Sequence, residues 1–240
     1  MLSDLEAMGY IIRKEDNLTL IYKPALPHLW DLAKTKDPMG ETTTLTGRSP
    51  LRFIEPDMVV RSLMHGGIFR HITGKRFLSP NRTIRELKVS AYLAAHGIRT
   101  PEILAVRLIK EGLFYTIDVV SGFIPDSKDL LVHFEKDQTD NLELLKKSGL
   151  LIRAVHDLGV YHTDLHIKNL LLDNSGNLWV LDLDKAYQCD LLPEFMKQMN
   201  LKRFIRSIKK WQTKGRIHLP DKWASSFLDG YHSISSSTFG

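Results

Sequence analysis

Residues 159–186 constrain the fold of this chain most, because they set a polar loop between two apolar runs: GVYHTDLHIKNLLLDNSGNLWVLDLDKA. The runs LLLD and LWVLD predict two short strands, and the residues NSGN between them are typical of a hairpin turn. Such a hairpin would fold Asp182, at the end of the second run, back beside Asp164 and Asn169. The sequence therefore predicts a cluster of oxygen-bearing side chains beside a small apolar sheet.

The residue types in this cluster favour magnesium and phosphate chemistry. Asp and Asn oxygens suit Mg²⁺, which binds proteins through one or two carboxylates and completes its shell with waters and substrate phosphates. A separate carboxylate can accept the proton of an attacking hydroxyl, which is the division of roles that phosphoryl transfer needs. Any one of these residues could instead serve a turn or a cap, so the prediction depends on Asp164, Asn169 and Asp182 together.

The rest of the chain changes from strand-like to helix-like patterns near its middle. Short apolar runs predict strands at residues 18–22, 57–63, 104–109 and 113–120. One helix interrupts this half, capped by Asn81 and stopped at Gly97, and another is predicted over 141–158 before Gly159. We therefore expect an α+β fold with a β-rich first lobe containing one principal helix, a connector near 119–127, and a mainly helical second lobe.

Charge and cysteine content narrow the class of protein. The 240 residues carry a net charge of +5, but residues 197–216 contain eight Lys or Arg and no acid, so the remainder is slightly acidic. A single cysteine, Cys189, excludes an internal disulfide and fits a reducing compartment. The N-terminal stretch lacks the pattern of a signal peptide and no apolar run reaches the length of a membrane span, so we expect a protein of the cytosol or of a membrane face.

Several motifs, taken in order, resemble a known family. His162-x-Asp164-Leu165-x-x-x-Asn169 matches the protein-kinase-like catalytic loop, with Asp182 in the place of the metal-binding Asp. The segments VVRSLMHGG (59–67), TIREL (83–87), HGIRTPEILA (96–105), VLDLDKA and NLKRFIRSIKKW extend the match over about residues 45–231. The chain resembles the lipopolysaccharide kinase family, and within it the members that act on 3-deoxy-D-manno-octulosonic acid (Kdo).

The resemblance implies a bilobal protein-kinase-like fold with lobes over residues 1–122 and 123–240 and ATP between them. Asp164 would be the catalytic base and His166 a donor to the transferred phosphoryl group. Asn169 and Asp182 would hold Mg²⁺, and Asp184 would either bind a second metal or cap a turn. The nucleotide would be bound by Arg61 paired with Glu86, with Lys75 as the substitute cation, by a turn at Gly47, and by the connector around Val120.

The implied reaction phosphorylates a hydroxyl of Kdo on a lipid A precursor, at the cytoplasmic face of the bacterial inner membrane. Heptose kinases and aminoglycoside-type phosphotransferases share the loop, so it does not exclude them; a non-catalytic kinase-fold binding protein would not need all three oxygen-bearing residues. His162 and His166 stand four residues apart, as zinc ligands on a helix do, but His162 is better interpreted as a brace bonded to backbone. No nucleic-acid partner is expected, and the oligomeric state is not predicted.

The basic segment allows two interpretations. Residues 200–212 place an apolar stripe on one side of a predicted helix: Leu201, Phe204, Ile205, Ile208 and Trp211. Five basic residues lie opposite: Lys202, Arg203, Arg206, Lys209 and Lys210. The stripe predicts packing on the helix's own lobe, with a solvated basic face. The basic face would also suit an anionic membrane surface, and the two interpretations are compatible.

Overall fold

The computed structural model describes residues 3–35, 39–43, 51–55, 57–63, 76–136 and 141–233. The chain forms two compact units, Met1–Ala91 with Glu102–Phe123 and Tyr92–Pro101 with Ile124–Gly240. The limits predicted for the lobes, 1–122 and 123–240, stay a prediction. The predicted first lobe included residues 92–101, but in the structure these residues belong to the second unit. Within that unit, the N–H of Val180 donates a hydrogen bond to the carbonyl oxygen of Arg99 at 2.9 Å.

In the described part of the chain, the first unit contains most of the strands and three helices. Its helices are α1 (Ser3–Ala7), α2 (Leu29–Thr35) and most of α4 (Asn81–Ala95). Its strands are β1 (Ile11–Glu15), β2 (Leu18–Tyr22), β3 (Glu41–Thr43), β4 (Leu51–Glu55), β5 (Met58–Ser62), β6 (Ile103–Glu111) and β7 (Phe114–Gly122). The strands form one antiparallel sheet in the order β1-β2-β6-β7-β5-β4-β3. The four predicted strands of this half are thereby confirmed.

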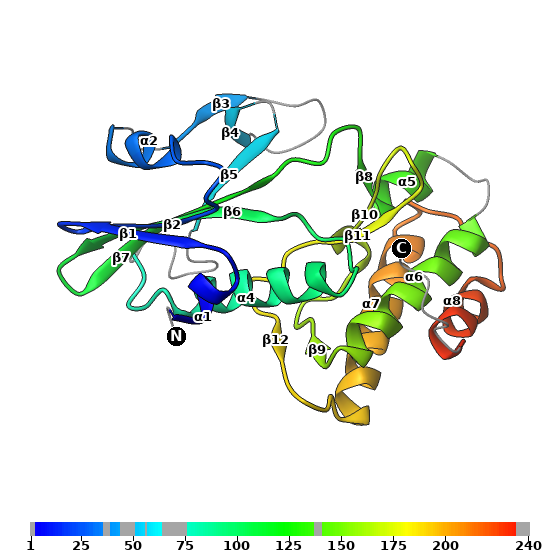
Figure 1. The fold of residues 1–240 in the computed structure, drawn as a ribbon. Helices are drawn as coiled ribbons and strands as arrows, with labels where there is room; N and C mark the ends of the chain where they lie inside the picture. The colour runs from blue at the N-terminus through cyan, green and yellow to red at the C-terminus, as the bar shows by residue number, and fades with distance from the viewer. Residues whose placement is uncertain are drawn as a thin grey trace. The chain divides into compact units, whose positions relative to one another are not determined.

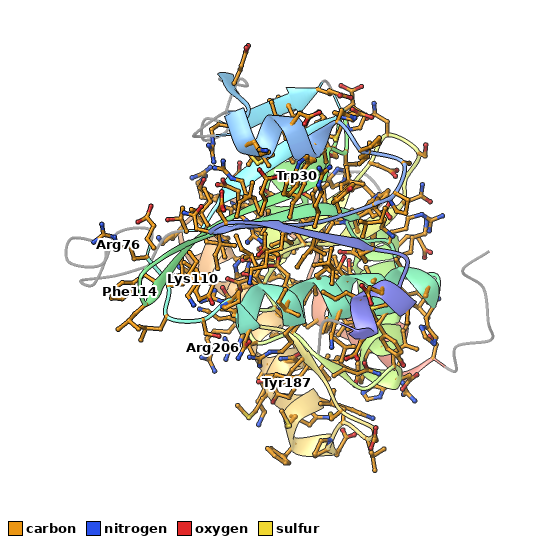
Figure 2. All side chains as sticks on the ribbon, turned by 60° about the vertical axis from the view of Figure 1, so that its left-hand side comes forward. Trp30, Arg76, Lys110, Phe114, Tyr187 and Arg206 are labelled. Atoms are coloured by element: carbon orange, nitrogen blue, oxygen red, sulfur yellow. The ribbon has the colours of Figure 1, made fainter. Side chains whose placement is uncertain are left out.

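Each face of this sheet is covered by its own helices, because side chains alternate along a strand. On one side α2 packs through Trp30 against residues that include Met58, Val60 and Val120 (Figures 1 and 2). On the other side α1 and α4 cover a second apolar cluster, to which the neighbouring Val119 belongs (Figure 1). The β7 strand therefore contributes to two cores with consecutive residues.

The principal helix of the first half, α4, was predicted correctly except for its cap. Ile84 and Leu87 are buried along it, and Gly97 follows it with φ +78°, a left-handed conformation that glycine adopts without strain. Asn81 is the first helical residue rather than the cap. Its N–H donates to Oγ of Ser79 at 3.2 Å, so Ser79 satisfies one of the free amide groups at this end.

The second unit is mainly helical, as expected, and carries short strands. Its helices are α5 (Leu130–Lys136), α6 (Asn141–Asp157), the 3₁₀ turn η2 (Ile167–Asn169), α7 (Glu194–Thr213) and α8 (Trp223–His232). Its strands are β8 (Lys128–Asp129), β9 (Val160–Tyr161), β10 (Leu170–Leu172), β11 (Leu178–Val180) and β12 (Tyr187–Gln188). The strands β10 and β11 pair as the predicted hairpin, with Leu170 opposite Val180. The α+β class is confirmed.

Two glycines allow α6 and α8 to touch backbone to backbone. A Cβ atom on Gly149 of α6 would overlap the carbonyl oxygen of Phe227, and one on Gly230 of α8 would overlap that of Lys146. Glycine inside a helix is less favourable than alanine by about 1 kcal/mol, so these positions sacrifice helix propensity for close packing. On α7, Phe204 stacks on Phe227 of α8 with ring centroids 4.9 Å apart.

The apolar stripe of α7 packs on its own unit, as predicted. Leu201, Phe204 and Ile208 are buried, whereas Ile205 and Trp211 are partly buried. No helix in the described part of the chain is both long enough and apolar enough to cross a membrane.

Candidate active site

The polar loop between β9 and β10 is built around the imidazole of His162, which is 1% exposed. The backbone N–H of Asp164 donates to Nδ1 of His162 at 3.3 Å, so the hydrogen is on Nε2 and is donated to the carbonyl oxygen of Leu181 at 2.8 Å. Burial lowers the pKa of His162, which favours this neutral form. The prediction that His162 is a brace bonded to backbone is confirmed.

Asn169 links the two halves of the predicted cluster. It is buried at the end of η2, and its Nδ2 donates to the carbonyl oxygen of Asp164 at 3.0 Å. Its own carbonyl oxygen accepts the N–H of Leu181 at 2.9 Å. Since Leu181 also accepts from His162 and directly precedes Asp182, the segments carrying Asp164, Asn169 and Asp182 are joined by consecutive hydrogen bonds.

Asp182 has an unusual backbone conformation. Its φ is +58°, in the left-handed region that costs a residue with a Cβ roughly 1 kcal/mol or more. The residue is exposed, and the bonds made by Leu181 hold the chain on its N-terminal side. Conformations of this kind concentrate at functional sites, where surrounding contacts hold them. Asp184, two residues further on, is partly buried in the turn that the N–H of Ala186 closes on the carbonyl oxygen of Leu183.

The carboxylate of Asp164 is open to solvent and flanked by two nitrogen-bearing side chains. Its side chain is 53% exposed. One oxygen, Oδ2, lies 3.7 Å from Nε2 of His166, and the other, Oδ1, lies 3.8 Å from Nη1 of Arg203. Both distances exceed those of hydrogen bonds, so both oxygens remain available to accept a hydrogen bond from a ligand hydroxyl.

Helix α7 faces this loop with three residues on one side, two of which are hydrogen-bonded to the loop backbone. Asn200 bonds to the backbone of His162, Arg203 approaches Asp164, and Oγ of Ser207 accepts the N–H of Ile167 at 3.0 Å. Positions three and four residues apart lie on the same side of a helix. Sequence reasoning missed Asn200 and Ser207, although two polar residues on the packed side of an apolar stripe were a usable signal.

A buried polar chain continues behind Asn200. Nε2 of His156 on α6 donates to Oδ1 of Asn200 at 3.2 Å, and Nδ1 of His156 accepts from the hydroxyl of Tyr231 on α8 at 2.8 Å. Burial lowers the pKa of His156 from 6.5 to about 4, so its ring is neutral near pH 7. Burial also raises the pKa of Tyr231 to about 12, which keeps its hydroxyl protonated as a donor. Three helices thus meet behind the polar loop between β9 and β10.

The first unit contains the predicted cation–glutamate pair. Nη2 of Arg61 on β5 donates to Oε1 of Glu86 on α4. The Glu86 side chain is 6% exposed, whereas that of Arg61 is 43% exposed. The carboxylate is therefore an internal anchor, and the guanidinium presents part of its surface outward.

A second charged cluster in this unit was not predicted. Asp118 on β7 accepts hydrogen bonds from Arg107 on β6, from Ser62 on β5 and from Arg52 on β4. Arg107 and Asp118 are each 1% exposed, so the pair is fully buried. The cluster joins four neighbouring strands, and we assign it a structural role because its groups are enclosed in the fold.

Three further residues, Gly47, Lys75 and Val120, were predicted to bind the nucleotide. Gly47 and Lys75 lie outside the described residues. Val120 is fully buried in the core that α2 covers, so its side chain packs the sheet, and its assignment to nucleotide binding stays a prediction.

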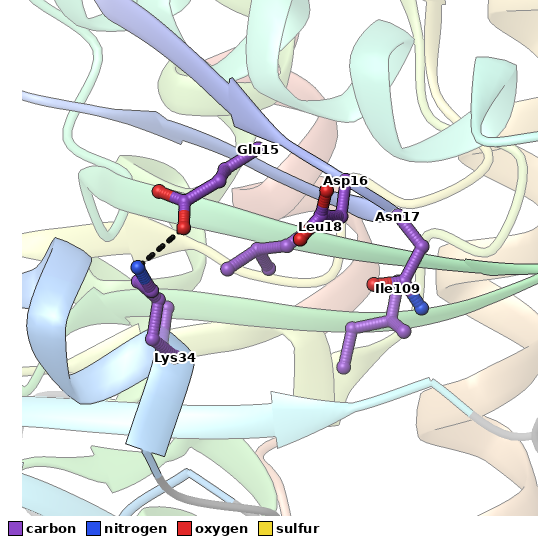
Figure 3. Close-up of a pocket in the computed structure, with 7 residues that line it drawn as sticks. Glu15, Asp16, Asn17, Leu18, Lys34 and Ile109 are labelled. Atoms are coloured by element: carbon purple, nitrogen blue, oxygen red, sulfur yellow. Dashed lines mark hydrogen bonds and ion pairs between the residues drawn. The ribbon is translucent and has the colours of Figure 1, made fainter.

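One pocket of the first unit is lined by none of the predicted site residues. It has a volume of about 200 Å³ at the β1–β2 turn and α2 (Figure 3). Nζ of Lys34 and Oε1 of Glu15 form an ion pair across its rim at 2.5 Å (Figure 3). None of its lining residues belongs to the motifs identified in the sequence.

The donor set of the loop fits a magnesium ion that shares its ligands with a phosphate. Within the described residues, no three side chains of His, Cys, Asp and Glu gather into a metal site of their own. Mg²⁺ does not need such a cage, since it commonly takes one or two protein oxygens and completes its shell from phosphates and water. The Nδ2 group of Asn169 is occupied by Asp164, which leaves its Oδ1 as the ligand atom, and Asp182 supplies a carboxylate. Their roles as ligands stay predictions.

Comparison with known proteins finds a matching family model and several similar proteins that share one name. The family model of the lipopolysaccharide kinase (Kdo/WaaP) family matches residues 32–231. The 3-deoxy-D-manno-octulosonic acid kinase of Vibrio vulnificus (strain YJ016) is 33% identical over 195 residues, covering 78% of this chain and 81% of that protein. The protein of the same name from Vibrio cholerae serotype O1 is 33% identical over 198 residues, with 80% of each chain covered. That of Haemophilus influenzae (strain PittEE) is 29% identical over 182 residues, covering 72% and 74%.

Proposed function

Because this chain belongs to the lipopolysaccharide kinase (Kdo/WaaP) family, we propose that it is an ATP-dependent kinase that phosphorylates a hydroxyl of Kdo on a lipid A precursor. The name shared by its relatives, 3-deoxy-D-manno-octulosonic acid kinase, supports this acceptor. The observation that carries the proposal is the hydrogen-bonded unit formed by the segments of Asp164, Asn169 and Asp182.

Asp164 is the proposed base. In the reaction the acceptor hydroxyl oxygen bonds to the γ-phosphorus of ATP, the bond between that phosphorus and the β–γ bridging oxygen breaks, and ADP leaves. Asp164 orients the hydroxyl and accepts its proton, for which an exposed carboxylate with two available oxygens is suited. His166, 3.7 Å from the same carboxylate, is the proposed donor to the transferred phosphoryl group.

Asn169 and Asp182 are the residues that would hold Mg²⁺ through Oδ1 and the carboxylate. The bound ion would neutralise phosphate charge during transfer. The chain's own contribution is rigidity, because the backbone bonds of Leu181 and the brace at His162 fix both ligands before the nucleotide arrives. Arg61, oriented by the buried Glu86, is the proposed contact to the nucleotide phosphates.

A panel of acceptors tests this function. The protein is incubated with labelled ATP, MgCl₂ and Kdo-lipid A, a heptose-containing core oligosaccharide or an aminoglycoside. Transfer to Kdo-lipid A alone supports the proposal, whereas transfer only to heptose or aminoglycoside would replace it with the corresponding alternative. Asp164→Ala should abolish transfer while retaining ATP binding, and Asp182→Ala should lose magnesium-dependent nucleotide binding. Turnover in the first variant, or unchanged affinity in the second, would contradict the assigned roles.

We further propose that the protein acts at the cytoplasmic face of the bacterial inner membrane, held peripherally through α7. The exposed side of this helix carries two apolar residues near its start, Phe195 and Met199, followed by four cations. These cations are Lys202, Arg206, Lys209 and Lys210. At 3.6 residues per turn all six lie on one face, of which Arg206 is shown in Figure 2. Each cation near an anionic surface contributes about 1 kcal/mol of attraction.

A further inference from the structure

Arg203 differs from the other basic residues of α7. The sequence placed it on the basic face with Lys202 and Arg206, which are exposed. In the structure it is only partly exposed, and its guanidinium lies near the carboxylate of Asp164, with Nη1 3.8 Å from Oδ1. Arg203 therefore differs from the other four cations of the predicted basic face, because its position on the helix brings it beside the loop that α7 braces.

The pair formed by Arg203 and Asp164 is too open to be explained as a stabilising contact. A separation of 3.8 Å between half-exposed partners contributes little to stability. In the described part of the chain, Asp164 is the one carboxylate within 4.0 Å of Arg203. A guanidinium carries five N–H donors in a planar fork, and this geometry leaves its donors available to a planar anion.

The position of Arg203 is nevertheless well defined. Asn200, three residues before it, and Ser207, four residues after it, are both bonded to the backbone of the catalytic loop. The helix therefore cannot slide along the loop without breaking those bonds. A hydroxyl hydrogen-bonded to Asp164 would lie beside the guanidinium, and an anionic group a few bonds from that hydroxyl could reach it.

We propose that Arg203 determines acceptor specificity by binding the carboxylate of an acid sugar while Asp164 binds the hydroxyl to be phosphorylated. The inference rests on the proposed function, since Kdo carries a carboxylate and neutral heptoses and aminoglycosides do not. The fork of arginine matches a carboxylate with two parallel hydrogen bonds, which a lysine at this position could not reproduce. A second source of negative charge, the γ-phosphate of ATP, is distinguished by the test.

The test measures phosphate transfer to two soluble acceptors, the methyl glycoside of Kdo and the C1 methyl ester of that glycoside. Wild-type protein is compared with the Arg203→Gln variant. The Lys147→Gln variant, at an exposed position of α6 outside every proposed site, is the control. We expect Arg203→Gln to lower kcat/KM for the carboxylate acceptor by about tenfold or more, as loss of a charged hydrogen bond predicts. The ester should react equally with both proteins, KM for ATP should not change, and Lys147→Gln should behave as wild type. Arg203→Lys should recover only part of the preference.

Two kinetic outcomes would overturn the inference. An equal loss with acid and ester would assign Arg203 to holding Asp164, and a raised KM for ATP would assign it to the γ-phosphate. Binding of the Kdo methyl glycoside, followed by NMR titration without nucleotide, separates this question from the proposed function. If wild type transfers phosphate to no acid sugar, the proposed function fails, yet glycoside binding that is lost in Arg203→Gln still supports a carboxylate site. Equal binding, or no binding, in both proteins removes it.

Discussion

Asn200 holds both polar groups of the His162 backbone, with Nδ2 donating to its carbonyl oxygen at 3.0 Å and Oδ1 accepting its N–H at 3.3 Å. The two residues are 38 positions apart, on α7 and at the start of the polar loop between β9 and β10. This contact connects the helix that carries the basic face to the loop that carries the proposed base. The first prediction concerns its loss.

Replacing Asn200 with Leu should destabilise the protein and slow transfer. The substitution leaves the His162 backbone groups and the Nε2–H of His156 buried without partners, at about 1–3 kcal/mol for each unsatisfied group. We expect kcat to fall more than KM for ATP changes, because the altered contact lies behind Asp164. Urea denaturation and steady-state kinetics measure both effects. The control is Gln198→Ala, which removes an exposed contact to Glu194 and should change stability by at most about 0.5 kcal/mol.

Stability should fall as pH decreases from about 6.5 to about 4. The pKa of His156 is lowered by burial to about 4, so in this window the unfolded chain binds a proton that the folded protein does not. Stability then rises with pH, and His156 contributes about 3 kcal/mol between the two limits. The lowered pKa of His162 acts in the same direction.

Unfolding free energies measured by urea between pH 4.5 and 7.5 check this expectation. In His156→Gln the unfolding free energy should rise less steeply with pH than in wild type. The difference in slope should correspond to about one proton bound on unfolding. Gln198→Ala, which changes no titratable group, provides the control and should keep the wild-type slope. An unchanged slope in His156→Gln would show that its ring is not the titrating group.

The partners Arg61 and Glu86 should respond unequally to mutation. Arg61→Ala removes a charged hydrogen bond from a buried carboxylate and should cost about 2 kcal/mol, whereas Glu86→Gln weakens a contact of a half-exposed guanidinium that water can solvate. Both changes should raise KM for ATP, since one removes the phosphate contact and the other its orientation. Thermal unfolding and nucleotide titration measure the two effects.

The double variant Arg61→Met with Glu86→Gln separates stability from binding. It should recover part of the stability lost in Arg61→Ala but none of the ATP affinity. The neighbouring Arg85 is exposed on α4, so Arg85→Ala is the matched control and should leave both properties unchanged. Recovery of ATP affinity in the double variant would remove Arg61 from the nucleotide site.

Alanine at Gly149 or Gly230 should destabilise the second unit despite its better helix propensity. Propensity alone predicts a gain of about 1 kcal/mol, but the new Cβ would overlap backbone atoms of the facing helix. Because backbone cannot move aside as a side chain can, we expect a net loss of about 1–3 kcal/mol. Denaturation of each variant beside Lys147→Ala, an exposed position of α6, measures the sign. A stabilised Gly149→Ala would contradict the close packing of α6 and α8.

The exposed face of α7 should bind anionic lipid. Changing Lys202, Arg206, Lys209 and Lys210 together to Gln should weaken binding to vesicles containing phosphatidylglycerol, by about 1 kcal/mol for each charge at low salt. Sedimentation with vesicles measures the loss. A control with the same change in net charge replaces Lys128, Lys136, Lys146 and Lys147, which are exposed elsewhere on the second unit. Equal affinity of wild type and the α7 variant would leave that helix with a structural role only.

The apolar runs and turn residues by themselves determined the principal strands, α4, α6 and the β10–β11 hairpin, because these signals act between neighbours in the chain. The loop carrying Asp164 and Asn169 was equally readable, since its spacing is local. The secondary structure of the N-terminal region was predicted less completely. The strand β1 has a mostly exposed pattern and α2 is short, so neither carries a strong periodic signal.

Only the tertiary structure decided which distant residues complete the site. The contacts of Asn200 with His162 and of Arg203 with Asp164 depend on the rotation of α7 about its axis, which the packing of Leu201, Phe204 and Ile208 fixes. Sequence spacing showed that the basic residues of 200–212 share a helix, but not that Arg203 among them lies beside Asp164. A small rotation of a packed helix exchanges the side chains that reach a neighbouring loop, and close packing of its buried face sets that rotation.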